Sequence, residues 1–127
     1  MRHRQMYRLM ALTVLSMSLA VPSAAQATKA DNLFRVSIVA AIAAHGADLG
    51  STLPCVSARR CREFNPILRP LSSRPVTLGT AKMALAGTSI VLVMVLHERH
   101  PRWATVLNFA IAVGHASVAW HNTKVAQ

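Results

Sequence analysis

Three long apolar runs limit what this chain can fold into. They cover residues 33–53, 76–96 and 103–120, and each is 18 to 21 residues long. We expect Pro54 to close the first run, and residues 97–102 to form a tight polar turn between the second and the third. About 20 apolar residues in helical form cross the hydrocarbon of a bilayer. None of the runs alternates apolar and polar residues as a membrane β-strand does, so a continuous helix is the backbone that lipid tolerates. The sequence therefore predicts an all-α membrane helical bundle with three transmembrane helices.

The composition agrees with this prediction. Hydrophobic residues make up 53% of the chain and charged residues 14%. Soluble domains carry about 25% charged residues. Because so few charged groups cannot cover a water-exposed globule of this size, lipid is the expected solvent for much of the chain.

The N-terminus has the pattern of an export signal. Three arginines precede a thirteen-residue apolar run, 9–21, which is too short to span a bilayer comfortably. Small residues follow, with Ala27 as the expected cleavage position. We therefore predict a signal peptide over residues 1–27 and an integral membrane domain over 28–127. If the signal stays uncleaved, the chain has four hydrophobic helices.

The basic residues flank the apolar runs and predict a topology. The net charge is +10, but aromatic residues for base stacking are scarce near the arginines, so no nucleic-acid binding is expected. A signal peptide places residue 28 outside, which makes loop 54–75 and the C-terminal tail cytoplasmic. The charge bias has the matching sign, and predicts a multi-pass protein of the bacterial inner membrane. The cytoplasmic residues would be Arg59, Arg60, Arg62, Arg69, Arg74 and Lys124, against Lys29, Arg35, Arg99 and Arg102 outside.

Two cysteines leave this topology open. Cys55 and Cys61 both lie in loop 54–75. In the cytoplasm they would be free thiols, whereas a disulfide would suit the oxidising side and reverse the topology. The loop contains no histidine, and two cysteines alone do not make a structural zinc site.

Small and polar residues form one face on each apolar run. Helices in lipid associate through close approach of small residues and through interhelical hydrogen bonds. Spacings of three and four residues place such residues on one helix face, so we expect three faces that turn inward. They consist of Ser37, Ala41, Ala44 and Asp48, of Gly79, Lys82, Ala86 and Ser89, and of Asn108, Ala112, His115 and Ala119.

The polar groups on these faces have similar depths. Asp48, Lys82 and His115 each lie five or six residues from the loop or tail end of their run. A rise of 1.5 Å per residue puts all three about 8–9 Å below one membrane boundary. We therefore predict that they converge, with His45 beside them.

Two interpretations of this convergence stay open. Charges are expensive within a membrane, and Asp48 and Lys82 would relieve each other as a structural ion pair. The alternative is a functional polar site. His45, Asp48 and His115 could ligate a metal, but the ammonium of Lys82 would repel the cation. We predict neither a metal nor another cofactor.

Short motifs add a resemblance. The chain contains Asp48-x-x-Ser51-Thr52, then Glu63-x-Asn65-Pro66, then Lys82 in the next apolar run. This pattern resembles a group of small bacterial and archaeal multi-pass membrane proteins of unknown function. The resemblance implies a connected polar site and no particular activity. That site would contain Asp48, Thr52, Glu63, Asn65 and Lys82.

The sequence lacks H-E-x-x-H, G-x-S-x-G and a phosphate-binding glycine loop. We therefore expect a non-enzymatic membrane protein. It would be a structural subunit, or one that contacts lipids or binds a membrane protein partner or further copies of itself. The alternatives are a membrane-embedded enzyme and a proton- or ion-linked carrier component. In each case the candidate binding residues are His45, Asp48, Thr52, Glu63, Asn65, Lys82 and His115.

Overall fold

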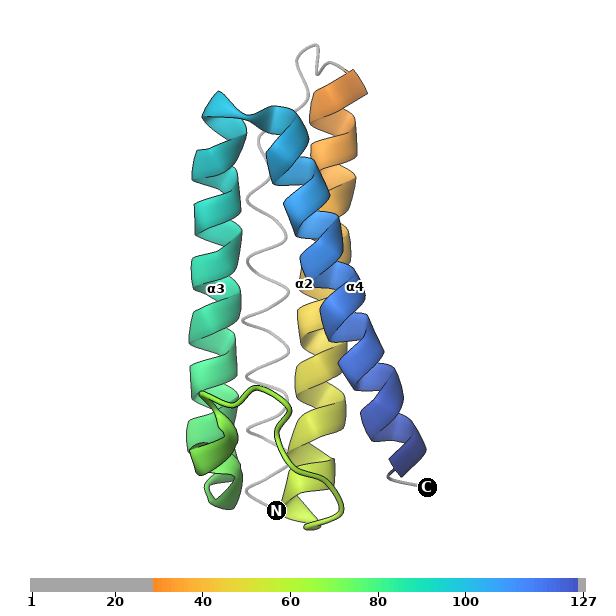
Figure 1. Cartoon of the computed structure of the whole chain (residues 1–127), viewed down its shortest axis with the longest axis vertical. Coiled ribbons are helices and arrows are strands. Elements are labelled where there is room, and N and C mark those ends of the chain that lie inside the picture. Colours follow the sequence, from red (N-terminus) through yellow and green to blue (C-terminus); the bar gives the residue numbers. More distant parts are fainter. Residues whose placement is uncertain (1–28, 126–127) are drawn as a thin grey trace, which may run out of the picture.

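The described part of the protein is a bundle of three long helices. The computed structural model describes residues 29–125, and the predicted signal peptide, 1–27, lies outside them. The prediction of an all-α fold with three apolar helices is confirmed, and residues 29–125 contain no strand. The elements are α2 (Lys29–Ser57), a short 3-10 helix η1 (Arg69–Ser73), α3 (Pro75–Arg99) and α4 (Pro101–Val125) (Figure 1).

The helices extend beyond the apolar runs. We expected Pro54 to close the first span, and this was wrong, because α2 continues through Pro54 to Ser57. Proline removes a backbone donor from a helix. Here it lies on the exposed side of the last turn, while the neighbouring Leu53 and Val56 are buried. Tertiary packing of the last turn therefore outweighs the local effect of proline.

The connection between α3 and α4 is shorter than predicted. Residues 97–102 were expected to form a polar turn, but only His100 separates the two helices. Pro101 begins α4. The first helical position tolerates proline because its N–H would lack an intrahelical partner in any case.

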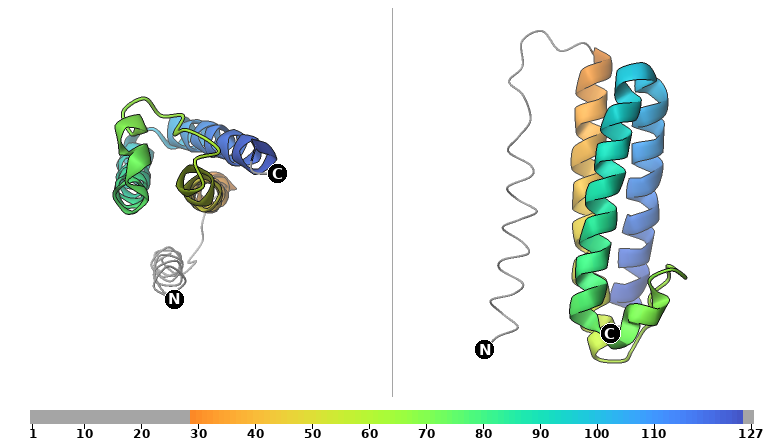
Figure 2. Two further views of the ribbon diagram at one scale, coloured as in Figure 1. Left: turned by 90° about the horizontal axis from the view of Figure 1, so that it is seen from below. Right: turned by 90° about the vertical axis from the view of Figure 1, so that its left-hand side faces the viewer.

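α2 and α4 run in the same direction, and α3 runs antiparallel to both (Figure 1). Viewed along the bundle, the three helices occupy the corners of a triangle (Figure 2). The α2–α4 interface is the most extensive of the three. Loop 58–74 and the C-terminal end of α4 lie at one end of the bundle, which we call the loop end.

The predicted small-residue faces form the helix contacts. On α2 the residues Ser37, Ala41, Ala44 and Asp48 are all buried, as expected. They meet the buried Asn108, Ala112 and Ala119 of α4. Ala41, Ala44 and Ala112 pack as one cluster, and Asn108 Nδ2 donates to Ser37 Oγ at 3.2 Å. On α3, Gly79 is buried, whereas Lys82, Ala86 and Ser89 are half-buried.

Large apolar side chains cover the outside of the bundle. Leu92, Trp103, Val113 and Trp120 are each between 63% and 71% exposed. A water-soluble monomer rarely exposes apolar surface so continuously. All three helices are long and apolar enough to cross a membrane.

Close packing of α2 against α4 makes a first prediction. The Ala41→Leu variant forces extra methylene groups into a contact where Ala41 is 0% exposed, and overpacking of this kind costs about 1–3 kcal/mol. Ala43→Leu, on the exposed side of the same helix, is the matched control. Thermal unfolding in mild detergent should show a lower midpoint for Ala41→Leu alone. Equal midpoints for both variants would contradict the close α2–α4 contact.

Candidate functional site

Asp48 joins α2, α3 and α4 at one point near the loop end. Its side chain is 4% exposed. Oδ1 accepts hydrogen bonds from Lys82 Nζ at 3.0 Å and Thr52 Oγ1 at 2.8 Å. Oδ2 lies 2.8 Å from His115 Nδ1. The structure thus brings together the three groups that were placed at equal depth from the sequence.

Lys82 lies between two carboxylates. Its Nζ is 2.8 Å from Glu63 Oε2 in addition to its contact with Asp48. The side chains of Lys82, Asp48 and Glu63 are 8%, 4% and 2% exposed. Nζ also donates to Thr52 Oγ1 at 3.4 Å, so the ammonium uses its three donors on three protein oxygens.

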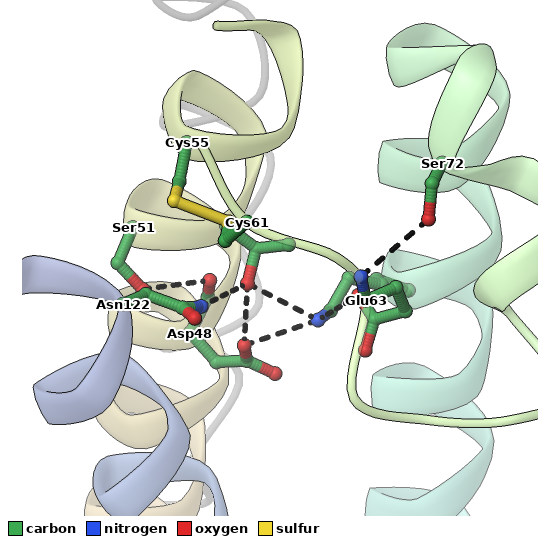
Figure 3. Close-up of a disulfide and its surroundings, with 9 residues drawn as sticks. Asp48, Ser51, Cys55, Cys61, Glu63, Ser72 and Asn122 are labelled. Carbon is green, nitrogen blue, oxygen red and sulfur yellow. Dashed lines mark hydrogen bonds and ion pairs between the residues drawn. A yellow bond between two sulfur atoms is a disulfide. The ribbon is translucent and has the colours of Figure 1, made fainter. Parts of the chain in front are cut away.

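The loop delivers Glu63 to this ammonium. The Asn65 backbone N–H donates to Glu63 Oε1 at 3.0 Å, and Asn65 Oδ1 accepts from the backbone of Ile67 at 3.0 Å. The hydroxyl of Ser72 lies 3.5 Å from the backbone nitrogen of Glu63 (Figure 3). Asn65 therefore shapes the turn around Glu63, and its bonds are to the loop.

The two cysteines are paired in the structure. A disulfide joins Cys55, in the last turn of α2, to Cys61, just before Glu63 (Figure 3). No cysteine within residues 29–125 is free. The structure thus agrees with the disulfide alternative, and the bridge anchors the loop close to the buried glutamate.

Hydrogen-bond directions around Thr52 assign the protons. Asn122 Nδ2 donates to Thr52 Oγ1 at 2.8 Å, as does the Lys82 ammonium. The single hydroxyl hydrogen of Thr52 therefore goes to Asp48. Because Asp48 also receives the ammonium, we assign it as a carboxylate and assign the proton to His115 Nδ1. Nε2 of His115 then remains for another partner.

Asn122 was not predicted from the sequence. It lies three residues beyond Ala119 and continues the same face of α4. This spacing could have identified Asn122, but the predicted third span ended at Trp120, whereas α4 continues to Val125.

His45 joins the site through a ring contact. Its ring centroid lies 4.0 Å from that of His115, at an interplanar angle of 49°. Its Nε2 lies 3.3 Å from Ser89 Oγ on α3. Sequence reasoning put Ser89 on the inward face of its run but not among the site residues. We call Asp48, Thr52, Glu63, Lys82, His115, His45, Ser89 and Asn122 the polar cluster.

The polar cluster borders a cavity of about 940 Å³ between α3 and the other two helices. Most of the other residues that line the cavity are apolar. Three glycines, Gly46, Gly87 and Gly114, line the cavity, and a Cβ added at any of them would meet nothing within 4 Å. The main apolar wall residues are Ile42, Leu49, Met83, Ile90, Ile111 and Val118.

The donor set does not suggest a metal centre. Within residues 29–125, no group of three or more His, Cys, Asp and Glu side chains could hold a metal ion. The two carboxylates are bonded to an ammonium instead.

No protein-family model, curated protein or solved structure matches the chain. The resemblance to the group of small membrane proteins therefore stays a prediction. Its motif residues are nevertheless in one network, since Asp48, Thr52 and Glu63 all bond Lys82 and Asn65 bonds Glu63.

The two-carboxylate environment of Lys82 makes a second prediction. Lys82→Met leaves Asp48 and Glu63 buried without their cation, and breaking a buried ion pair costs about 3–5 kcal/mol. The folded protein should accumulate poorly and unfold at a lower temperature in detergent. Asp48→Asn should also lower accumulation, because it removes one partner of the ammonium.

The matched control is Lys124→Met, which removes an exposed lysine near Trp120. The triple variant Lys82→Met, Asp48→Asn, Glu63→Gln removes all three charges and should recover part of the lost stability. If Lys82→Met and Asp48→Asn both accumulate like the wild type, the three side chains are not coupled in the membrane.

Proposed function

We propose that the protein is an integral membrane protein that binds a lipid-like molecule with an uncharged polar group in the cavity beside the polar cluster. The observation that carries this proposal is one cavity whose lining combines apolar side chains with hydrogen-bonding groups. Binding sites for small molecules combine these features at volumes of roughly 300–1,000 Å³. These features support a lipid-contacting rather than a catalytic role.

The charges of the polar cluster favour an uncharged ligand group. Lys82 faces two carboxylates, so the charged residues of the cluster sum to −1 when both histidines are neutral. The ammonium is already bonded to Asp48 and Glu63. An anionic headgroup would meet these carboxylates without a spare cation, which is unfavourable in a medium of low dielectric. A hydroxyl or amide group carries no such penalty.

The ligand contacts would come from the two histidines and Ser89. All three line the cavity, and the side chain of His115 is 34% exposed. With Nδ1 bonded to Asp48, Nε2 of His115 can accept a hydrogen bond from a ligand hydroxyl. Asp48 thereby orients His115 in addition to neutralising Lys82.

The glycines of the cavity lining are further support for a ligand that binds between the helices. Glycine in a helix interior is about 0.8–1.0 kcal/mol less favourable than alanine. Gly46 and Gly87 are both helical glycines at positions where a Cβ would meet nothing within 4 Å. Both also line the cavity. Their absence of side chains keeps the cavity wide.

An enzyme that acts on the same ligand is the second candidate. Ser89 Oγ lies 3.3 Å from His45 Nε2, and His115 is bonded to Asp48. The Ser89 hydroxyl donates to the backbone carbonyl of Ala86 at 2.8 Å, so it would have to turn toward Nε2 for His45 to act as its base. The ammonium of Lys82 is committed to three oxygens, so it offers no donor to an oxyanion. A fluorophosphonate probe that labels wild-type protein but not Ser89→Ala would favour the enzyme.

We further propose that the protein lies in the bacterial inner membrane with the loop end on its outer, oxidising side. Support comes from the Cys55–Cys61 pairing, since disulfides persist in oxidising compartments. This orientation reverses the one expected from the predicted signal peptide and from the arginines of the loop. We give the disulfide more weight than the charge bias, because that bias is only six basic residues on one side of the membrane against four on the other.

Sidedness can be tested by thiol labelling of intact cells, which is our third prediction. Cys55 and Cys61 should react with a membrane-impermeant maleimide only after treatment with an impermeant reductant. A Cys55→Ser, Cys61→Ser variant controls for labelling elsewhere. Labelling that needs permeabilised cells but no reductant would place free thiols in the cytoplasm and overturn the proposed orientation.

A cavity-filling variant tests the ligand, as a fourth prediction. The protein is reconstituted in phosphatidylcholine nanodiscs that contain a diazirine-bearing diacylglycerol, whose headgroup is a hydroxyl. Light should attach this lipid to peptides of α2 and α3 that line the cavity. Gly87→Leu fills the cavity, and overfilling costs about 1–3 kcal/mol, so the yield of adduct should fall about tenfold.

Gly50→Leu is the matched control, because Gly50 is an exposed helical glycine with equally open space but no place in the cavity wall. Its adduct yield should equal that of the wild type. Equal yields for Gly87→Leu and the wild type would show that the lipid does not occupy the cavity.

A further inference from the structure

A second recess lies at the loop end, separate from the main body of the cavity. Its volume is about 390 Å³, and residues of the loop and the last turns of α4 line it. Glu63 and Phe64 line both spaces and therefore form the partition between them. The recess has a basic lining that comprises Arg60, Arg62, Arg69 and His121.

Glu63, the acidic residue that lines the recess, uses its carboxylate on partners other than Arg62 and Arg69. Glu63 turns its carboxylate to Lys82 Nζ, at 2.8 Å, and to the backbone N–H of Asn65. It presents its backbone carbonyl to Arg69, whose Nε donates to that oxygen at 3.4 Å. This contact uses one of the five N–H donors of the guanidinium. The positive charges of Arg62 and Arg69 are therefore retained.

Phe64 and His121 hold the recess in place. Their rings meet edge to face with centroids 5.1 Å apart, which joins the loop to α4. The backbone of the loop is tied to the bundle by the Cys55–Cys61 disulfide on one side of Arg62 and by the buried Glu63 on the other. Arg62 is thus carried by a short, anchored segment rather than by a free tail.

We propose that this recess binds the phosphate group of an anionic phospholipid. Arginine recognises phosphate through planar, paired N–H donors, and Arg62 and Arg69 supply two such groups from opposite parts of the loop. The recess lies at the end of apolar helices, at the level where headgroups gather when those helices cross a bilayer. Basic pockets at this level bind anionic headgroups. The site does not depend on a ligand in the main cavity.

The test measures lipid retention by the full chain. Nanodiscs are prepared from phosphatidylcholine with a minor fraction of phosphatidylglycerol, and native mass spectrometry records which lipid stays bound after the disc is removed. The wild type should retain phosphatidylglycerol in preference to phosphatidylcholine. Since each arginine near a membrane surface contributes about 1 kcal/mol, Arg62→Gln, Arg69→Gln should weaken retention about tenfold or more.

The control is Arg59→Gln, Arg74→Gln, which removes the same charge from loop arginines that do not line the recess. It should retain phosphatidylglycerol like the wild type. The single variant Arg62→Gln keeps the hydrogen bond from Arg69 to Glu63. A partial loss of phosphatidylglycerol retention in this variant would show that Arg62 binds the lipid, because the loop is still held by that bond. Circular dichroism checks that each variant is folded.

Two outcomes would overturn the proposal. An equal loss in both double variants would show that the arginines act only through general surface charge. Displacement of the lipid by millimolar inorganic phosphate would assign the recess to a soluble anion. Because Gly87→Leu should leave phosphatidylglycerol retention unchanged, failure at the recess and failure at the main cavity are distinguishable.

Discussion

The ammonium of Lys82, held between Asp48 and Glu63, is the interaction on which the structure depends. A charged group in an apolar helix carries a large free-energy cost unless it is paired. Here side chains from three helices and a loop meet around it. Asp48 comes from α2, Lys82 from α3 and Glu63 from the loop. The bond from Asp48 to His115 adds α4. Removal of the ammonium would therefore leave Asp48 and Glu63 buried without their cation.

The unequal packing of the helices explains why a cavity accompanies this interaction. α2 and α4 approach closely through alanine and serine, with Ala41 and Ser37 fully buried. α3 buries only Leu78, Gly79 and Val93 within its described length. Near the loop end, Leu78 of α3 packs in one cluster with Leu53 and Val56 of α2. One turn further along α3, the long side chain of Lys82 reaches across to Asp48. The long side chain of Lys82 reaches across a gap between helices that is wider than close packing of small residues allows, and space is left beside it.

The depth of a residue in the membrane and the helix face on which it lies were enough to predict part of the site. Asp48, Lys82 and His115 share both, and a buried charge must find a partner, so their convergence followed from the sequence. Glu63 came only from a resemblance, because a loop residue has no helical register from which to infer its position. Pro54 was misread, since packing of the last turn overrode its local preference. The cavity was not predicted, because the separation between helices depends on side chains from all three at once.

A structural ion pair alone does not account for the polar cluster. Buried ion pairs are often no more stabilising than apolar residues of similar volume, so stability by itself gives little reason to assemble one. The ammonium is already satisfied by Asp48, Glu63 and Thr52. His45 and Ser89 take no part in neutralising it, yet both line the cavity, where His45 contacts the ring of His115. Polar groups that the ion pair does not need, set against open apolar space, are what a ligand with one polar group and an apolar chain requires.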